Sequence, residues 1–169
     1  MTHSDLVEIG KKWLARPHHK LGFGSSGFIF AELHSYSGEI PDVIGFTMDC
    51  SILIECKVSR GDFLTDKRKK FRKTPLRGMG NYRYYLCPPD VIKIKDLPKG
   101  WGLLYAYPKK VRVIKESGDR DKIGRRRRPF VGPKIAANER PLMYTALRRM
   151  NIRGHLDEIY DRSTAPKRG

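Results

Sequence analysis

The stretch Ser51-Ile52-Leu53-Ile54-Glu55-Cys56-Lys57-Val58 is a short apolar run interrupted by a carboxylate and an ammonium. Its length and its apolar residues are typical of a buried strand. Charged groups inside such a strand are costly unless each has a partner or a chemical task. A second acid, Asp42 in the dipeptide Pro41-Asp42, lies thirteen positions before Glu55, which is the distance of one hairpin. The two acids together indicate a divalent metal ion as their shared partner, and such a site is typical of phosphodiester cleavage.

The composition points to a single domain with a polyanionic partner. The chain has 169 residues, enough for one ordinary domain with a substantial core. Lysine and arginine number 35 against 18 acids, and the formal net charge is +17. This excess favours a polyanionic partner, because neutralising phosphates releases counterions and steers the encounter. The sequence has no apolar stretch long enough to span a bilayer and no basic amphipathic helix with a broad apolar face, so a membrane partner is not expected.

The cysteines predict a reducing compartment. Cys50, Cys56 and Cys87 are odd in number, scattered, and without a CxxC pair. We therefore expect reduced thiols in a cytoplasmic compartment and no zinc site. The start of the chain, residues 1–5, lacks a basic segment followed by an apolar run, so no secretory signal is expected.

The remaining sequence predicts alternating helices and strands in one α/β domain over residues 1–160. Ser4 is a candidate cap for a first helix, and the Ser59/Asp62 pair matches the capping box of a second. Helices are expected over residues 5–14, 59–72 and 138–150, and strands over residues 28–33, 40–47, 51–58, 82–87, 102–107 and 111–115. Residues 116–137 are expected to form a basic, mobile loop, and residues 161–169 a tail. The order αβββαβ, followed by further strands and a helix, indicates a mixed sheet flanked by helices.

The hairpin between the second and third strands determines whether the acids meet. A tight turn centred on Asp49 and Cys50 would place Asp42 opposite Lys57 and diagonal to Glu55. Diagonal neighbours are about 7–8 Å apart, close enough for two carboxylates to share one ion. A shift of one residue in this pairing would move Asp42 to the other face of the sheet.

Each residue of the predicted site has a chemical role. Asp42 and Glu55 would hold Mg²⁺ or Mn²⁺, since these ions prefer oxygen ligands and retain bound water. Lys57 would position the attacking water or stabilise charge on the phosphoryl oxygens. The backbone carbonyl of Cys56 would complete the metal shell, while its thiol faces the core. The alternative is structural: Asp42 caps a turn, and Glu55 pairs with Lys57 or with an arginine.

The pattern Pro41-Asp42, then Glu55-Cys56-Lys57 after a hairpin, then a basic helix, resembles the PD-(D/E)xK nuclease superfamily. The similarity covers roughly residues 5–90, and residues 55–64 resemble small nuclease-like proteins of phages and bacteria. The resemblance implies a restriction-endonuclease-like αβββαβ core and Mg²⁺-dependent cleavage of DNA, with Asp42, Glu55 and Lys57 in the metal and catalytic positions. Many members carry a further acid on the first helix. Glu8 fits that description, and Glu32 on the preceding strand competes with it.

Two basic segments are candidate phosphate-binding surfaces. The second half of the helix after the site is rich in cations and lacks interleaved acids, so self-repulsion favours a phosphate-tracking role. Its candidate residues are Lys67, Arg68, Lys69, Lys70, Arg72 and Lys73. The run Arg125, Arg126, Arg127 and Arg128 is a second candidate clamp, for which a solvated loop is an equally good interpretation. Tyr82, Tyr84, Tyr85, Trp101 and Tyr105 are interpreted as sheet and core residues.

Three classes of function fit these features. The first is a metal-dependent deoxyribonuclease, acting at ends or internally. The second is a catalytically inactive protein of the same fold that binds DNA or RNA, since some superfamily members have lost catalysis. The third is a small interaction protein whose basic face binds a nucleic-acid mimic. The intact set of Asp42, Glu55 and Lys57 favours the first, because acids near phosphate repel it unless a cation lies between them.

Overall fold

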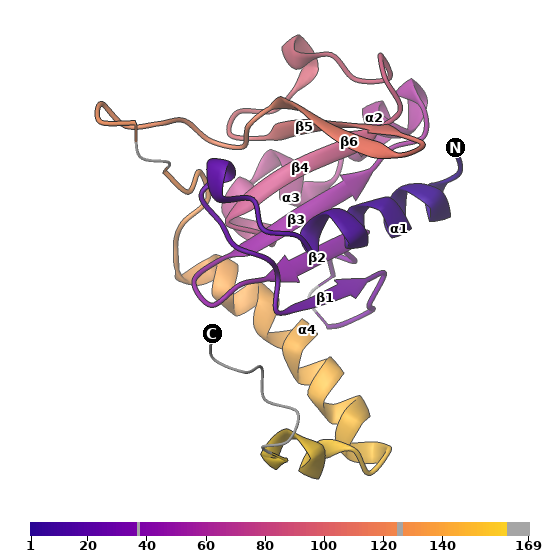
Figure 1. The fold of residues 1–169 in the computed structure, drawn as a ribbon, viewed down its shortest axis with the longest axis vertical. Helices are drawn as coiled ribbons and strands as arrows, with labels where there is room; N and C mark the ends of the chain where they lie inside the picture. Colours follow the sequence, from indigo (N-terminus) through magenta and orange to yellow (C-terminus); the bar gives the residue numbers. More distant parts are fainter. Residues whose placement is uncertain (37, 125–126, 162–169) are drawn as a thin grey trace.

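The computed structural model describes residues 1–36, 38–124 and 127–161, in which six strands form one sheet in the order β1-β2-β3-β4-β5-β6 (Figure 1). The strands are β1 (Phe28–Ala31), β2 (Val43–Phe46), β3 (Ser51–Cys56), β4 (Tyr82–Cys87), β5 (Gly102–Tyr107) and β6 (Lys110–Lys115). Strands β1, β2 and β3 form an antiparallel meander, β3, β4 and β5 run parallel, and β6 returns antiparallel to β5. The sheet is therefore mixed, as the sequence predicts.

The helices form the covering layers on both faces of the sheet and one of its two parallel connections. They are α1 (His3–Leu14), α2 (Arg60–Asp66), α3 (Lys70–Lys73) and α4 (Pro133–Ile152), with 3₁₀ turns η1 (His19–Leu21), η2 (Pro75–Arg77), η3 (Ile94–Asp96) and η4 (Leu156–Tyr160). Strand β3 reaches its parallel neighbour β4 through α2 and α3, the kind of crossover that parallel pairing requires. The observed order of α1, β1, β2, β3, α2 and β4 confirms the predicted αβββαβ order.

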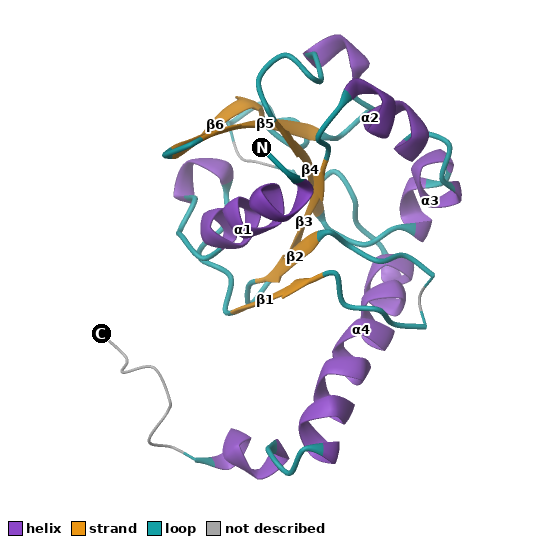
Figure 2. Cartoon of the chain, turned by 90° about the vertical axis from the view of Figure 1, so that its right-hand side faces the viewer, coloured by secondary structure: helices purple, strands orange, loops and turns teal. Residues whose placement is uncertain are grey.

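Two apolar cores lie on opposite faces of the sheet. On one face α1 buries Leu6, Val7 and Leu14 against even-numbered residues of β3, such as Ile54. On the other face Leu53 packs with residues of α2 and α4. Figure 2 shows α1 on one side of the sheet and α2, α3 and α4 on the other. Each fully buried large apolar side chain of this kind contributes about 1.5–3 kcal/mol. Tyr82, Tyr84, Tyr85 and Trp101 are buried and Tyr105 is half-buried, which confirms their interpretation as sheet and core residues.

Several helix ends differ from the prediction, each for a local reason. Thr2, and not Ser4, caps α1: its hydroxyl accepts from the Asp5 N–H, while the Asp5 carboxylate accepts from the Thr2 N–H. Helix α2 ends at Asp66 instead of continuing to residue 72. Helix α4 starts at Pro133, whose fixed φ suits the first helical position, so its start precedes the expected residue 138.

The segment expected to be a mobile loop, residues 116–137, is partly packed. Ser117 is buried, and its hydroxyl donates to the Gly100 carbonyl and accepts from the Arg83 N–H. Phe130 and Ile135 are buried in the second core. Arg125 and Arg126 lie outside the described residues, as does the expected tail beyond residue 161.

Candidate active site

The β2–β3 hairpin brings the two predicted acids directly opposite each other. The pairing Val43↔Ile54 and Phe46↔Ser51 centres the turn on Met48 and Asp49. Extending it by one pair places Asp42 opposite Glu55, so the expected pairing of Asp42 with Lys57 is wrong by two residues. Side chains alternate along a strand, so a difference of two keeps Asp42, Glu55 and Lys57 on one face.

The Thr47 side chain explains where the turn is centred. Its hydroxyl accepts from the backbone N–H groups of Asp49 and Cys50, at 3.3 and 3.1 Å, and its own N–H donates to the Cys50 carbonyl. A threonine that caps the two following amide groups favours this local turn over one displaced along the chain. The Thr47–Cys50 pair is therefore hydrogen-bonded, which sets the alternation for the rest of the ladder.

Because of this alternation, Pro41 leaves the Cys56 carbonyl without a hydrogen-bond donor from the neighbouring strand. Hydrogen-bonded pairs recur every second residue, so Asp42 and Glu55 form a non-hydrogen-bonded pair, the type whose side chains lie closest. The next hydrogen-bonded position pairs Pro41 with Cys56. Proline has no N–H, so β2 supplies no ladder donor to the Cys56 carbonyl. The Cys56 N–H donates instead to Asp42 Oδ2, at 2.7 Å.

Lys57 is buried among three carboxylates. Its Nζ lies 3.3 Å from Glu55 Oε2, 3.6 Å from Asp66 Oδ1 and 3.7 Å from Asp42 Oδ2. Burial opposes the charged ammonium, but the charges of Glu55 and Asp42 outweigh it and raise the pKa of Lys57 above its ordinary value. The lysine is therefore charged at neutral pH and held beside both predicted metal ligands.

Asp42 is poised between its two protonation states. Burial, together with the neighbouring Glu55 charge, raises the pKa of Asp42 to about 6, although Lys57 and the Cys56 N–H oppose that shift. Two carboxylates that face each other resist ionising together unless a cation lies between them. The geometry therefore gives this pair an affinity for positive charge.

Arg72, which was predicted to bind phosphate, lies among the buried carboxylates Glu39, Glu55 and Asp66, and we call these four residues the Arg72 cluster. Arg72 donates to Glu39 Oε1 at 2.8 Å and to Asp66 Oδ2 at 2.7 Å, and its Nη2 lies 3.0 Å from Glu55 Oε2. Its side chain is 2% exposed and its guanidinium lies 4.8 Å from the Trp101 ring centroid. The prediction that Arg72 contacts nucleic acid is therefore wrong, because its charge is directed into the protein. The structural alternative for Glu55, pairing with Lys57 and an arginine, is present in the geometry.

Glu39 and Asp66 are the site residues that sequence reasoning missed. Glu39 Oε2 accepts from the Met79 N–H at 2.8 Å, and Asp66 Oδ2 accepts from the Tyr85 hydroxyl at 2.9 Å. Both carboxylates are buried. Asp66 could have been recognised in the sequence as the acid that directly precedes a run of cations. No sequence pattern indicates Glu39, because its partners are distant in the sequence.

The residues present fit a divalent cation. Glu55 Oε1 is buried without a hydrogen-bond partner among the described residues, so this carboxylate has one oxygen left to accept a ligand. Within the described ranges no group of three or more acid, histidine or cysteine side chains is arranged to hold a metal. A cation here would therefore take two carboxylates, the Cys56 carbonyl and water, a set that suits Mg²⁺ or Mn²⁺. The Cys56 thiol faces the α1 core, as expected.

The two candidates for a further acid differ in position. Glu32 Oε1 lies 3.3 Å from His3 Nε2, and the same nitrogen lies 3.8 Å from Asp42 Oδ1, so one imidazole links Glu32 to the site. Glu8 instead pairs with Lys11 at 2.7 Å on the exposed side of α1. The structure therefore favours Glu32 over Glu8.

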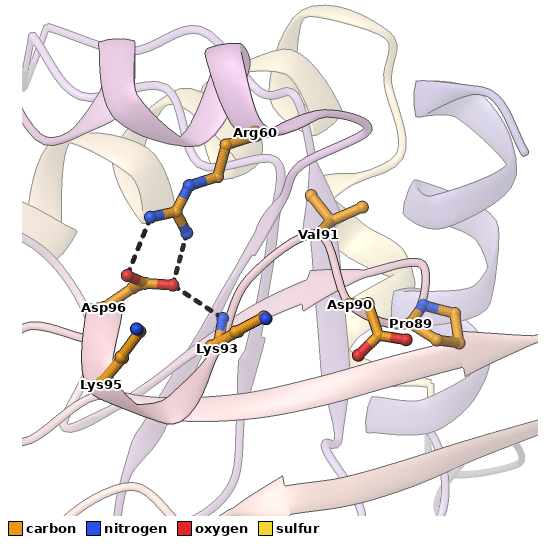
Figure 3. Close-up of a pocket in the computed structure, with 7 residues that line it drawn as sticks. All are labelled: Arg60, Pro89, Asp90, Val91, Lys93, Lys95 and Asp96. Atoms are coloured by element: carbon orange, nitrogen blue, oxygen red, sulfur yellow. Dashed lines mark hydrogen bonds and ion pairs between the residues drawn. The ribbon is translucent and has the colours of Figure 1, made fainter.

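A hollow lies between the start of α2 and the β4–β5 connection. Figure 3 shows Arg60, at the start of α2, in a two-pronged ion pair with Asp96, whose carboxylate also accepts from the Lys93 N–H. The other lining residues are Pro89, Asp90, Val91 and Lys95. Arg60 follows Lys57 by three residues, and the Lys57 N–H donates to the Leu86 carbonyl near the start of the opposite wall. Lys93 and Lys95 therefore line a hollow beside the start of α2, and the predicted metal ligands are not among its lining residues.

The other predicted basic residues are mostly at the surface. Lys67, Arg68, Lys69 and Lys73 are exposed, and Lys69 Nζ lies 3.0 Å from Asp66 Oδ1. The Lys70 side chain is outside the described part of the structure. Arg127 and Arg128 are exposed, and Arg128 lies 3.9 Å from Asp49. Cys50, Cys56 and Cys87 are free thiols, and all three are buried.

Comparison with known proteins identifies no family. No family model and no curated protein matches the chain. A solved structure described as the SPO1766 protein of unknown function from Silicibacter pomeroyi aligns over 83% of this chain and 84% of its own, with 18% identity and a TM-score of 0.48. A likeness of this size carries no argument about function. Among the described helices, none is long and apolar enough to cross a membrane.

Proposed function

We propose that this chain is a metal-dependent nuclease that hydrolyses phosphodiester bonds of DNA and has a restriction-endonuclease-like core. One observation carries the proposal: Asp42 and Glu55 face each other across β2 and β3, beside a Cys56 carbonyl that Pro41 leaves without a ladder donor, and Lys57 Nζ lies within 4 Å of both carboxylates. The topology supports it, since an antiparallel β1-β2-β3 meander followed by a helical crossover to a parallel β4 is the order that the PD-(D/E)xK resemblance implies.

Each residue has a defined task in this proposal. Asp42, Glu55 and the Cys56 carbonyl would hold Mg²⁺ or Mn²⁺, which when bound polarises the scissile phosphate and acidifies a water molecule. Lys57 keeps its proton, so it acts through charge and hydrogen bonding on a water or a phosphoryl oxygen, not as a base. Asp66 and Arg72 fix the orientations of Lys57 and Glu55. The exposed cations after α2 and the lysines near Arg60 would hold the flanking phosphates.

A second candidate is a catalytically inactive protein that binds DNA or RNA. The observation that favours it is the contact of Arg72 with Glu55 Oε2, because a guanidinium already supplies positive charge where a metal would. Glu55 and Lys57 are also deeply buried, at 1% and 3% exposure, so substrate access would require a local opening.

Cleavage assays separate the two candidates. Supercoiled, linear and single-stranded DNA are incubated with the protein in Mg²⁺, in Mn²⁺ or in EDTA. We expect metal-dependent cleavage that Asp42→Asn, Glu55→Gln and Lys57→Met each reduce by about 10²-fold or more, while the exposed control Lys11→Met retains activity. Calorimetry with Mn²⁺ supplies an independent measurement. Uptake of Mn²⁺ by the wild type and not by Asp42→Asn supports the site, whereas no uptake and no cleavage would leave the inactive binder.

A further inference from the structure

The second half of α4 projects from the body of the protein. The buried residues of α4 are Ile135, Glu139 and Leu142, all in its first half. Glu139 anchors that half, since its Oε1 accepts from the Ser51 hydroxyl at 2.6 Å and from the Gly80 N–H at 2.8 Å. Figures 1 and 2 show the helix continuing away from the sheet beyond this anchor. The projecting half is therefore available to a partner.

The exposed charges of α4 are all positive. Glu139 is the only acid in this helix, whose residues are all described, and it is buried. No ion pair within the described residues involves the exposed cations of α4 and its C-cap, which are Lys134, Arg140, Arg148, Arg149 and Arg153. A helix whose exposed charges are all positive and make no ion pair in the described part of the structure is complementary to a polyanion, as is a chain of net charge +17.

Aromatic rings and arginines meet in one hollow beside this helix. The hollow lies between α4 and the β1–β2 connection, and two tyrosines, one from each element, border it. Tyr36 is 92% exposed and Tyr144 is 57% exposed. Tyr144 and Arg148 share a face of the helix because they are four residues apart. The full lining is His34, Ser35, Tyr36, Tyr144, Thr145, Arg148 and Arg149.

The hollow is close to the candidate active site along the chain. Tyr36 follows Glu32, which contacts the site through His3, and precedes Glu39 by three residues. Three residues span at most about 11 Å between Cα atoms. Glu39 shares the Arg72 guanidinium with Glu55, so the hollow is three residues along the chain from a side chain that contacts the candidate site.

We propose that this hollow binds unpaired nucleotides, with bases stacking on Tyr36 and Tyr144 and phosphates contacting Arg148 and Arg149. Unpaired bases present the flat faces that exposed aromatic side chains can cover, whereas the bases of a duplex are already stacked on one another. As the substrate class of the site described above, single-stranded or frayed DNA, this inference rests on the proposed nuclease function. The binding itself requires neither metal nor cleavage.

Binding in EDTA tests the hollow without cleavage. Fluorescence anisotropy compares a labelled oligothymidylate of about 20 nucleotides with a duplex of the same length, long enough to cover one site. The Tyr36→Ala/Tyr144→Ala variant should weaken single-strand binding by about tenfold and duplex binding by less than about twofold, because only the stacking is lost. All substituted side chains are exposed, and thermal melting verifies that the variants fold.

The arginines have a separate readout and a matched control. Arg148→Ala/Arg149→Ala should reduce the slope of log K against log salt for single strands by about 1.4, which corresponds to two phosphate contacts. The control Lys109→Ala/Lys110→Ala removes the same charge from exposed positions in the β5–β6 turn and at the start of β6, and should leave the ratio of single-strand to duplex affinity unchanged.

Several outcomes would overturn the proposal. Unchanged single-strand affinity in the tyrosine variant would exclude stacking, and so would an equal loss for both nucleic acids. If the lysine control loses as much single-strand affinity as the arginine variant, the binding depends on overall charge and not on this hollow. Polyaspartate that competes as well as oligothymidylate would identify an acidic protein as the partner instead. Tyrosine-dependent binding without any cleavage in Mn²⁺ would overturn the proposed nuclease and keep this binding site. Cleavage of single-stranded DNA that the tyrosine variant leaves unchanged would keep the nuclease and overturn this binding site.

Discussion

Replacing Arg72 by alanine should destabilise the folded protein more than any other removal of one arginine from the basic segment after the site. The guanidinium is buried and contacts Glu39, Glu55 and Asp66 at 2.7–3.0 Å. Its removal leaves three buried carboxylates with less compensation. Arg68, four residues earlier, is exposed and provides the matched control.

The expected loss follows from opposing electrostatic effects. At an effective dielectric constant of about 20, one pair of unit charges 4 Å apart attracts by about 4 kcal/mol. Arg72 forms three such pairs, but desolvation of the guanidinium and repulsion among the three acids offset much of their summed attraction. Breaking a buried ion pair costs about 3–5 kcal/mol, so we expect Arg72→Ala to lower the free energy of unfolding by about 4 kcal/mol at pH 7. Domains of this size are stable by about 5–15 kcal/mol, so the variant is expected to be marginally folded.

The stability difference between wild type and Arg72→Ala should depend on pH. Burial opposes ionisation of Asp66, but Arg72 holds the pKa of this carboxyl well below its ordinary value. A carboxyl with a lowered folded pKa stabilises the protein above its unfolded pKa, and this stabilisation is lost as pH falls through the folded pKa. The difference in stability between wild type and Arg72→Ala should therefore be largest at pH 7 and shrink below about pH 4.

Urea titrations followed by circular dichroism measure this difference. Arg68→Ala should stay within about 0.5 kcal/mol of wild type. Adding Glu39→Gln to Arg72→Ala removes one stranded carboxylate and should restore about 1 kcal/mol. A loss below about 1 kcal/mol for Arg72→Ala at pH 7, or a loss that grows on acidification, would refute the account of Arg72 as the buried counter-ion of the cluster.

Three further substitutions test other parts of the structure. The folded state holds the Asp42 proton more tightly than the unfolded chain, so in EDTA stability should fall as pH rises from about 4 to about 6, and Asp42→Asn should flatten that part of a urea-derived stability curve. Glu139→Ala strips the acceptor from two buried donors, which should cost about 2–3 kcal/mol and speed hydrogen exchange in α4. Gly80→Ala should lower the melting temperature and the unfolding free energy by about 2 kcal/mol or more, since Gly80 has φ +86° and a Cβ there would lie 2.7 Å from that of Leu53; an unshifted melting curve would contradict this.

The sequence predicts the order of helices and strands and the pairing of the two acids on one face of the sheet, because both depend on local patterns. Alternation along residues 51–58 assigns Glu55 and Lys57 to one face. The short hairpin assigns Asp42 to the same face both in the expected register, which pairs Asp42 with Lys57, and in the observed one, which pairs it with Glu55. Choosing between those registers requires the hydrogen bonds of the Thr47 hydroxyl. A sequence pattern alone does not show which of several polar residues caps a turn.

The Arg72 cluster could not be predicted because its contacts are distant in sequence. Arg72 and Glu39 are separated by 33 positions, and no periodicity relates them. Arg72 and Asp66 are six residues apart, which on a continuous helix would place them on different faces. They meet because α2 ends at Asp66 and the chain turns before α3. A basic run in the sequence gives no indication that one of its members is directed inward.

The β2–β3 hairpin limits how this protein can vary in length during evolution. Gaining or losing one residue within the paired segments 42–46 or 51–55 would rotate one acid to the α1 side of the sheet, where Ile54 and Cys56 pack. Gaining or losing two there would slide the acids along the sheet but keep them on a common side. Relatives of this chain should therefore vary in length at the turn, residues 47–50, or by even numbers within the paired segments, or carry a bulge that compensates for an odd one.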